Sequence, residues 1–401
     1  MNIKRTLLAA VASVLVGTEA LAGTYGWDAS DNSTLFTSFK NYMKTMQTEL
    51  VGEPLYFMAQ QLLVDCEASF RSAPYAWLGM VHRFCNMAES IYGPAASHPR
   101  ALDNDKYARI RKALLHLRDY PMHEVSLTTD AVYPPAEQRT AFNYANQQWL
   151  NEKRKHFLAF LASPRPTGKE LQINKLYSSG VVFRTKNACI GIDICYNEAF
   201  GTTEGVSELA SALDVLYVTH AHGDHYDNSL VTAMLNLGKP VVMPKNIFGT
   251  NKGTEVIWST TQATKTLLGG VANTAAVMSA QGEEPCLLYH IDIDGWRIIH
   301  VGDNSHHENE PQLANYAMAD VVVAPIFQGL TTLFWQISGA SNPDNAQQFY
   351  LSIHENEFHH TIDGRVSYKY LYSDAGALGS TSNKYPCTLL MDNGEHIVLV
   401  K

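Results

Sequence analysis

The spacing of apolar residues divides the chain into two parts. From about residue 33 to residue 162, apolar residues recur every three or four positions, which is the spacing of amphipathic helices. This pattern predicts helices over 33–46, 55–70, 75–91, 107–117 and 136–161. The segment Pro164–Gly168 (Pro-Arg-Pro-Thr-Gly) is the clearest linker in the chain, and we place a domain boundary there.

Beyond the linker, short apolar or alternating runs predict β-strands instead. Strands are expected over 171–177, 181–183, 189–194, 215–219, 287–293, 296–301, 321–324 and 349–353. Asp294 and Gly295 predict a hairpin turn between two of these strands. Helical stretches fall between several strands, so we expect a layered α/β domain in this part.

The first 22 residues have the pattern of a secretory signal peptide. Lys4 and Arg5 precede about ten apolar residues, which are too few to span a bilayer. Ala20-Leu21-Ala22 supplies a cleavage pattern, whereas a retained anchor or a core helix is the alternative. We therefore expect a signal peptide at 1–22, a helical domain at 23–168 and an α/β domain at 169–401. The mature protein is expected to be periplasmic or secreted, with no integral membrane span after the signal is removed.

Export would bring the six cysteines of the chain into an oxidising compartment, where disulfides can form. Cys66 and Cys85 could pair across a helical hairpin, and Cys286 and Cys387 could pair if their strands are neighbours. Buried free thiols are an equally good interpretation of each cysteine.

Composition and charge narrow the range of partners. The 401 residues are 46% hydrophobic, which is ample for a large core, and the net charge is −9. That charge argues against binding nucleic acid or anionic membranes through bulk electrostatics, so we expect a small-molecule substrate. An oligomeric state is compatible with the sequence. The histidines concentrate from His220 onward, which directs attention to the second half of the chain.

The densest group of candidate ligands follows the apolar strand at 215–219 directly. His220, His222, Asp224 and His225 lie within six residues. Burying these polar groups without partners costs free energy, and a divalent cation is their natural shared partner. His220 and His222 can point to one side of an extended turn, whereas Asp224 and His225 can face a second ion.

This motif resembles the signature of the metallo-β-lactamase-fold hydrolases, and other segments agree in order. Asp193 is similar to the strand-ending aspartate that braces the metal loop in that family. Gly302-Asp303 is similar to the segment whose carboxylate bridges two metals, and 319–326 to the strand-to-proline segment that follows. The strand that ends at His354 is similar to the one carrying the final ligand.

The resemblance covers about residues 170 to 401. It is closest to the branch that contains sugar-phosphate lactonases and N-acyl-phosphatidylethanolamine phospholipase D. It implies an α/β fold, a four-layer αββα metallo-β-lactamase-like sandwich preceded by a mainly helical N-terminal domain.

The resemblance also divides the ligands between two metal sites. The first would use His220, His222 and a further histidine. The second would use four residues, namely Asp224, His225, Asp303 and His354. His359 and His360 compete with His354 for the last position, and Asp193 braces the loop without binding metal.

One ligand of the first site is missing. The family places a histidine about twenty residues before the Gly-Asp motif, where this chain has none. The substitute candidates are Gln281, Glu283, Glu284 and the histidines after the motif, His306 and His307. An oxygen ligand would shift preference from zinc towards manganese or iron.

The expected chemistry is hydrolysis of an ester, lactone or phosphodiester by a metal-bound hydroxide, held by one or two zinc or other divalent ions. Asp224 would orient the hydroxide and carry a proton to the leaving group. The main alternative is a one-metal or catalytically silent member that only binds a ligand, because the first site lacks a histidine. A redox enzyme with a di-iron site is a third hypothesis. A true β-lactamase is disfavoured, since those enzymes differ from this chain at Asp303.

Overall fold

The structure is a computed structural model of the whole chain. It describes residues 32–73, 76–92, 110, 113–120, 136–244, 255–256, 263–281, 284–304, 319–325, 349–355, 367–368 and 387–401. The predicted signal peptide at 1–22 lies outside these ranges. Within these ranges, no helix is both long enough and apolar enough to cross a membrane.

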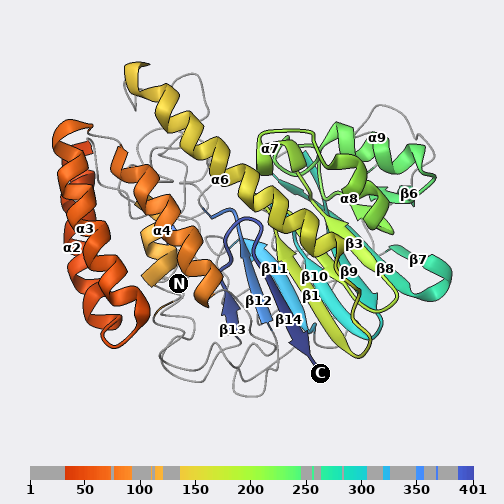
Figure 1. Cartoon of the computed structure of the whole chain (residues 1–401). Coiled ribbons are helices and arrows are strands. Elements are labelled where there is room, and N and C mark those ends of the chain that lie inside the picture. Colours follow the sequence, from red (N-terminus) through yellow and green to blue (C-terminus); the bar gives the residue numbers. More distant parts are fainter. Residues whose placement is uncertain are drawn as a thin grey trace, which may run out of the picture.

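The N-terminal part is helical, as its spacing predicts. Its main helices are α2 (Asn32–Glu49), α3 (Pro54–Ser72), α4 (Ala76–Tyr92) and α6 (Ala136–Ala162) (Figure 1). Helix α3 begins at a proline, whose missing N–H has no partner to lose in the first turn. Aromatic side chains join these helices, since the Phe36 ring centroid lies 4.1 Å from that of Phe70 and 5.2 Å from that of Trp77.

The remainder of the described chain forms two seven-stranded sheets. The first has the order β14 (His396–Val400), β1 (Glu170–Lys175), β2 (Val181–Arg184), β3 (Cys189–Ile192), β4 (Val215–Tyr217), β5 (Val241–Met243) and β6 (Glu255–Val256). The second has the order β13 (Cys387–Leu389), β12 (Phe349–Ile353), β11 (Val321–Pro325), β10 (Trp296–His300), β9 (Glu284–Ile293), β8 (Ala272–Gln281) and β7 (Ala263–Leu267). The short 3-10 helix Leu268–Gly270 separates β7 from β8. The hairpin predicted at Asp294 and Gly295 joins β9 to β10 in antiparallel pairing.

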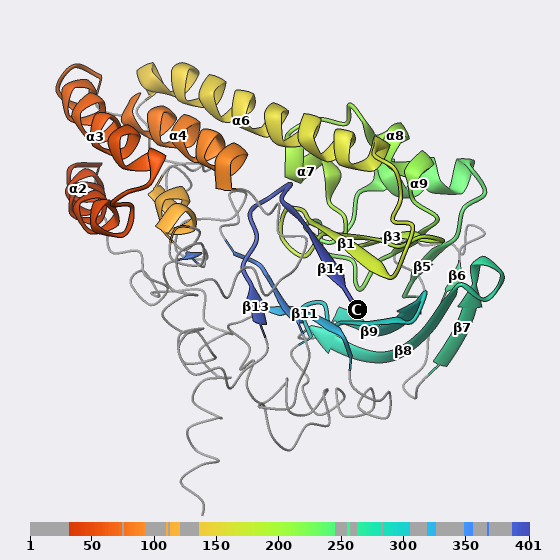
Figure 2. The same cartoon turned by 60° about the horizontal axis from the view of Figure 1, so that its bottom comes forward.

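Two apolar cores separate the layers. One core lies between the sheets and contains apolar side chains from both, such as Ile190 and Tyr289. The other lies on the outer face of the first sheet and joins residues of the N-terminal helices, such as Trp149 and Phe157, to residues of that sheet. Helix α6 and the short helices α7 (Tyr196–Phe200), α8 (Val206–Ala212) and α9 (Asn228–Asn236) cover this face (Figure 2).

The mixed α/β architecture with a helical N-terminal region and two sheets is therefore confirmed. For the fourth expected layer, on the far side of the second sheet, the described residues provide no test. Helix α6 ends before the predicted linker and β1 begins after it. The predicted division into domains stays a prediction, because the N-terminal helices share their core with the first sheet.

Parallel pairing brings several strand ends to one edge. Strand β3 runs parallel to β4, and β10, β11 and β12 run parallel to one another. The sheets are tied together there, since the Leu287 N–H donates to the Thr219 carbonyl over 2.8 Å and the Tyr289 hydroxyl to the Val218 carbonyl over 2.7 Å. Candidate residues that follow these strands therefore meet between the sheets. The strand predicted over 189–194 ends earlier, at Ile192, because Asp193 adopts a positive φ of 48°.

The cysteines of the described residues are thiols. No disulfide joins them, and the thiols are Cys66, Cys85, Cys189, Cys195 and Cys286. Burial raises the pKa of Cys66 and of Cys189 to about 12, so neither forms a thiolate readily. The side chain of Cys387 lies outside the described residues.

Candidate metal centre

Four of the predicted ligands meet at one point. Asp224, His225, Asp303 and His354 each offer a ligand atom, and these atoms lie within 4.8 Å of one another. His225 Nε2 lies 3.4 Å from Asp224 Oδ2 and 3.2 Å from Asp303 Oδ2. His354 Nε2 contacts Asp303 Oδ1. The group is the one that the resemblance assigns to a second metal site.

Each member of this group follows a strand. Asp224 and His225 belong to the loop between β4 and α9, and Asp303 follows β10 in the second sheet. His354 follows β12 and has a positive φ of 65°. Residues separated by more than a hundred positions are thus brought together by the shared edge of parallel strands.

Asp193 lies directly beneath the cluster and is completely buried. Its Oδ1 accepts the backbone N–H of Thr219 over 2.7 Å, and its Oδ2 accepts the Thr219 hydroxyl over 2.6 Å. The same Oδ2 lies 2.8 Å from His225 Nδ1, so the ring turns its Nε2 towards the other carboxylates. Burial alone would raise the pKa of Asp193, but His225 holds it below its ordinary value.

His220 and His222 are placed differently. The His220 ring is fully buried, and its centroid lies 4.0 Å from that of His225. Burial lowers the pKa of His220 to about 3, so this imidazole is neutral and keeps a free electron pair. His222 is exposed, with its ring centroid 4.7 Å from that of His220.

The charges of the cluster compensate one another. Burial alone would lower the pKa of His225, but Asp303, Asp224 and Asp193 raise it well above its ordinary value. Burial would likewise raise the pKa of Asp303, but His225 and His354 hold it well below its usual range. The carboxylates therefore gather around a point where they favour a positive charge, and a raised pKa of His225 is one expression of this.

The donor set fits a divalent ion. The buried Nε2 of His220 has no hydrogen-bond partner among the described residues, and the buried Nε2 of His225 faces the carboxylates of Asp224 and Asp303. Buried polar atoms without partners are rare in proteins, and the His220 ring packs against that of His225 within the same cluster. Imidazole nitrogens combined with carboxylate oxygens suit zinc, iron or manganese.

The substitute ligands proposed for the first site are not located. Gln281 and Glu284 pair across the end of the β8–β9 hairpin. Their side chains, Glu283, His306 and His307 lie outside the described residues, as do His359 and His360.

Sequence reasoning missed two residues that contact the cluster, Ser178 and Ser179, and took His300 for a strand residue of the core. Ser178 and Ser179, in the turn between β1 and β2, contact the His354 ring on its Nδ1 side over 3.3 Å and at Nε2 over 2.7 Å. His300 lies 3.2 Å from the Ser179 carbonyl. A Ser-Ser-Gly segment between two strands indicates a turn, and nothing in its composition indicates a site.

Comparison with known families agrees with this arrangement. Residues 172–341 match the family model of the Beta-lactamase superfamily domain. Residues 172–341 carry a beta-lactamase superfamily domain. The metallo-β-lactamase resemblance inferred from the order of motifs is thereby confirmed. At the level of the superfamily, the match supports a metal-dependent hydrolase.

Several solved structures resemble the superfamily domain. Igni18, a metallo hydrolase from Ignicoccus hospitalis, is 18% identical with a TM-score of 0.44, over 57% of this chain and 98% of that one. The metallo-beta-lactamase fold protein YhfI from Bacillus subtilis is 14% identical with a TM-score of 0.41, over 58% and 100% of the two chains. CmlA, a diiron beta-hydroxylase from Streptomyces venezuelae, is 13% identical with a TM-score of 0.39, over 59% and 55%. No curated protein matches the chain.

Proposed function

We propose that this protein is an exported metal-dependent hydrolase that cleaves an ester, a lactone or a phosphodiester. The observation that carries the proposal is the cluster of Asp224, His225, Asp303 and His354, with buried imidazole nitrogens turned towards carboxylates. Export to the periplasm or beyond is supported by the signal-peptide pattern. A small molecule is the proposed substrate, because the net charge of −9 disfavours nucleic acid.

The cluster residues differ in their access to solvent, which suggests a division of roles. The His225 side chain is fully buried, whereas 14% of the Asp224 side chain is exposed. His225 and Asp303 would hold the ion from the protein side. Asp224, on the more open side, would orient the attacking water and carry a proton to the leaving group.

A divalent ion bound here, most simply zinc, would lower the pKa of water and polarise the substrate's carbonyl or phosphoryl oxygen. The chain's own contribution is to fix the geometry and keep the donors deprotonated. Asp193 does this for His225 by holding Nδ1, which leaves Nε2 for the ion.

A one-metal protein is the second candidate. In the described part of the chain, the four residues of the second site converge, whereas His222 of the first site is exposed. A single ion per chain would agree with that difference, with His220 as an adjacent donor. Titration with zinc, followed by elemental analysis after dialysis, distinguishes one bound ion from two.

The function is tested by metal content and hydrolysis measured together. The purified protein, loaded in turn with zinc, manganese and iron, is assayed on a panel of lactones, phosphodiesters and esters. We expect Asp224→Asn to lower kcat/KM by about 100-fold or more, which is typical for loss of a positioned proton carrier. Asp294→Asn, which changes an exposed carboxylate in the β9–β10 turn, is the matched control. A wild-type protein that retains no transition metal would refute the proposal.

A further inference from the structure

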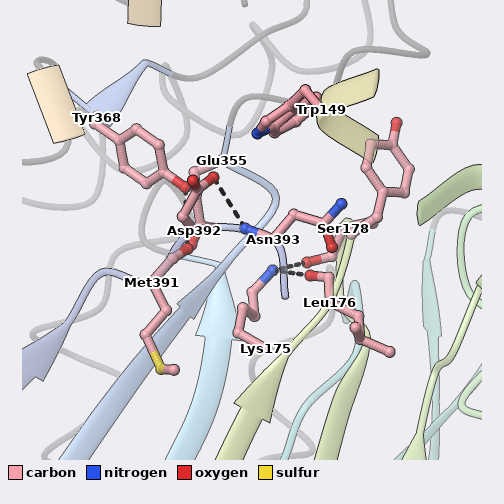
Figure 3. Close-up of a pocket in the computed structure, with 10 residues that line it drawn as sticks. Trp149, Lys175, Leu176, Ser178, Glu355, Tyr368, Met391, Asp392 and Asn393 are labelled. Atoms are coloured by element: carbon pink, nitrogen blue, oxygen red, sulfur yellow. Dashed lines mark hydrogen bonds between the residues drawn. The ribbon is translucent and has the colours of Figure 1, made fainter. Parts of the chain in front are cut away.

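The turn between β1 and β2, residues 176–180, is held in an unusual way. Lys175 is buried, and its ammonium group donates to the carbonyls of Leu176 over 2.7 Å and of Ser178 over 2.5 Å (Figure 3). Ser178 has a positive φ of 54°, a conformation that non-glycine residues seldom adopt. The buried ammonium group of Lys175 thus holds two carbonyls of a strained turn, and strained backbone held in this way is typical of functional sites.

The turn is also connected to the loop that carries Asp303. The Gly302 N–H donates to His300 Nδ1 over 3.1 Å, so the neutral His300 ring carries its proton on Nε2. That Nε2 then donates to the Ser179 carbonyl over 3.2 Å. Burial lowers the pKa of His300, which agrees with a neutral ring in this position. His300 thus fixes the distance between the two loops.

The Ser178 hydroxyl joins two of the cluster residues. It donates its only proton to Asp224 Oδ2 over 3.1 Å. The same oxygen lies 3.3 Å from His354 Nδ1, and because its proton is already used it can only accept there. His354 therefore carries a proton on Nδ1, which leaves the electron pair of Nε2 available to an ion.

We infer that Ser178 is a positioning residue of the proposed metal centre, setting the tautomer of His354 and holding Asp224 in place. The inference rests on the proposed function, because it assigns a role towards the same ion. Asp193 does the corresponding work for His225, so each of the two imidazoles has a partner on the nitrogen facing away from the ion. Removing such a partner typically weakens metal binding by about 10- to 100-fold.

Ser179 has the opposite relation to the same ring. Its hydroxyl lies 2.7 Å from His354 Nε2, the nitrogen that would bind the ion. An ion bound at this nitrogen would displace the contact with the Ser179 hydroxyl, so that contact does not support the ion-bound state. Removing the Ser178 hydroxyl should weaken binding, whereas removing the Ser179 hydroxyl should leave it unchanged or strengthen it.

The first test compares zinc affinity, by competition with a chromogenic chelator, for wild-type protein, Ser178→Ala, Ser178→Gly and Ser179→Ala. Glycine tolerates the positive φ, so Ser178→Gly removes the hydroxyl without adding backbone strain. We expect both Ser178 variants to bind zinc about 10- to 100-fold more weakly, and Ser179→Ala to bind at least as tightly as wild type. Equal affinity in the wild type and both Ser178 variants, or an equal loss in Ser179→Ala, would overturn the inference.

The second test detects the tautomer directly. In protein loaded with cobalt(II), ligand imidazole N–H protons give shifted NMR signals, which persist only while hydrogen bonds protect them from exchange with water. We expect one such signal to disappear in Ser178→Ala and to remain in Ser179→Ala. An unchanged set of signals in Ser178→Ala refutes the tautomer assignment. If the wild-type protein itself binds neither zinc nor cobalt, the proposed function fails, and this is a different result from failure of the Ser178 inference.

Discussion

Replacing Asp193 by asparagine is the sharpest single test of how the loop after β4, which carries Asp224 and His225, is held in place. The substitution keeps the size of the side chain, and asparagine tolerates the positive φ of 48° at this position. It removes the negative charge and places an NH₂ group where one carboxylate oxygen stood. If the NH₂ group takes the place of Oδ1, it faces the Thr219 N–H. If it takes the place of Oδ2, it faces the Thr219 hydroxyl and His225 Nδ1. In either orientation a donor faces a donor.

The cost follows from burial. Both the Asp193 and the His225 side chains have no exposed surface, so water cannot replace the lost interaction. Breaking a buried charged pair by removing one partner typically costs about 3–5 kcal/mol. We therefore expect the free energy of unfolding of the metal-free protein to fall by about 3 kcal/mol or more.

The matched control is Asp294→Asn. Asp294 also has a positive φ, of 49°, and also accepts hydrogen bonds, from the backbone and the side chain of Asn187. Because Asp294 is exposed, water can take over these interactions, and we expect a change within about 0.5 kcal/mol. Urea unfolding followed by circular dichroism measures both variants against wild type. Losses of similar size in the two variants would refute the reasoning that burial makes Asp193 important.

Four further predictions concern the site and the helices packed against the first sheet. Gly302→Ala should destabilise the protein by about 2–5 kcal/mol, because Gly302 has a φ of 55° and an added Cβ would lie 2.8 Å from the Thr219 hydroxyl. Thermal unfolding measures this loss, and a variant that unfolds at the same temperature as the wild type would contradict the prediction. The apparent zinc affinity should rise from pH 6 to pH 8, because the ion must displace the proton that the neighbouring carboxylates hold on His225; a flat profile in chelator competition contradicts it. The raised pKa of His225 also stabilises the metal-free protein. This stabilisation is complete below pH 6.5, the ordinary histidine pKa, and is lost as the pH rises through the pKa of His225 in the folded protein. The urea midpoint of the metal-free protein should therefore fall towards alkaline pH. A chain that starts at residue 169 should unfold at lower urea or aggregate, because it exposes the core that Phe157 shares with the first sheet; unaltered stability would show that the two parts are independent.

Local patterns predict elements well where a strand or helix carries its own signal. Helices α2, α3, α4 and α6 differ from their predicted ranges by only a few residues, since their apolar spacing is long and regular, whereas the helix predicted over 107–117 lies partly outside the described residues. The turn at Asp294 and Gly295 was equally clear. Strands β7 and β8 were not predicted, because Thr, Asn and Ser interrupt their apolar pattern.

The cluster was accessible from sequence because each of its members follows a strand directly, and the order of the strands is characteristic of one family. The end of β3 was misjudged by two residues, since only the fold shows that Asp193 must turn towards Thr219. Ser178 could not be found in this way. Its role depends on contacts with Asp224 and His354, which lie 46 and 176 positions away and carry no trace in the local sequence.

The position of β14 has a consequence for how the molecule is assembled. This strand pairs with β1 from Glu170↔Val400 to Asn174↔His396, so the first sheet gains its outer strand only after more than 200 further residues have been made. Just before β14, Asp392 accepts a hydrogen bond from the buried ammonium group of Lys153, which lies in helix α6, 239 positions earlier. Contacts of such long sequence separation form late and slowly in folding. The first sheet and the buried Lys153–Asp392 pair are therefore completed only when the last residues of the chain are available.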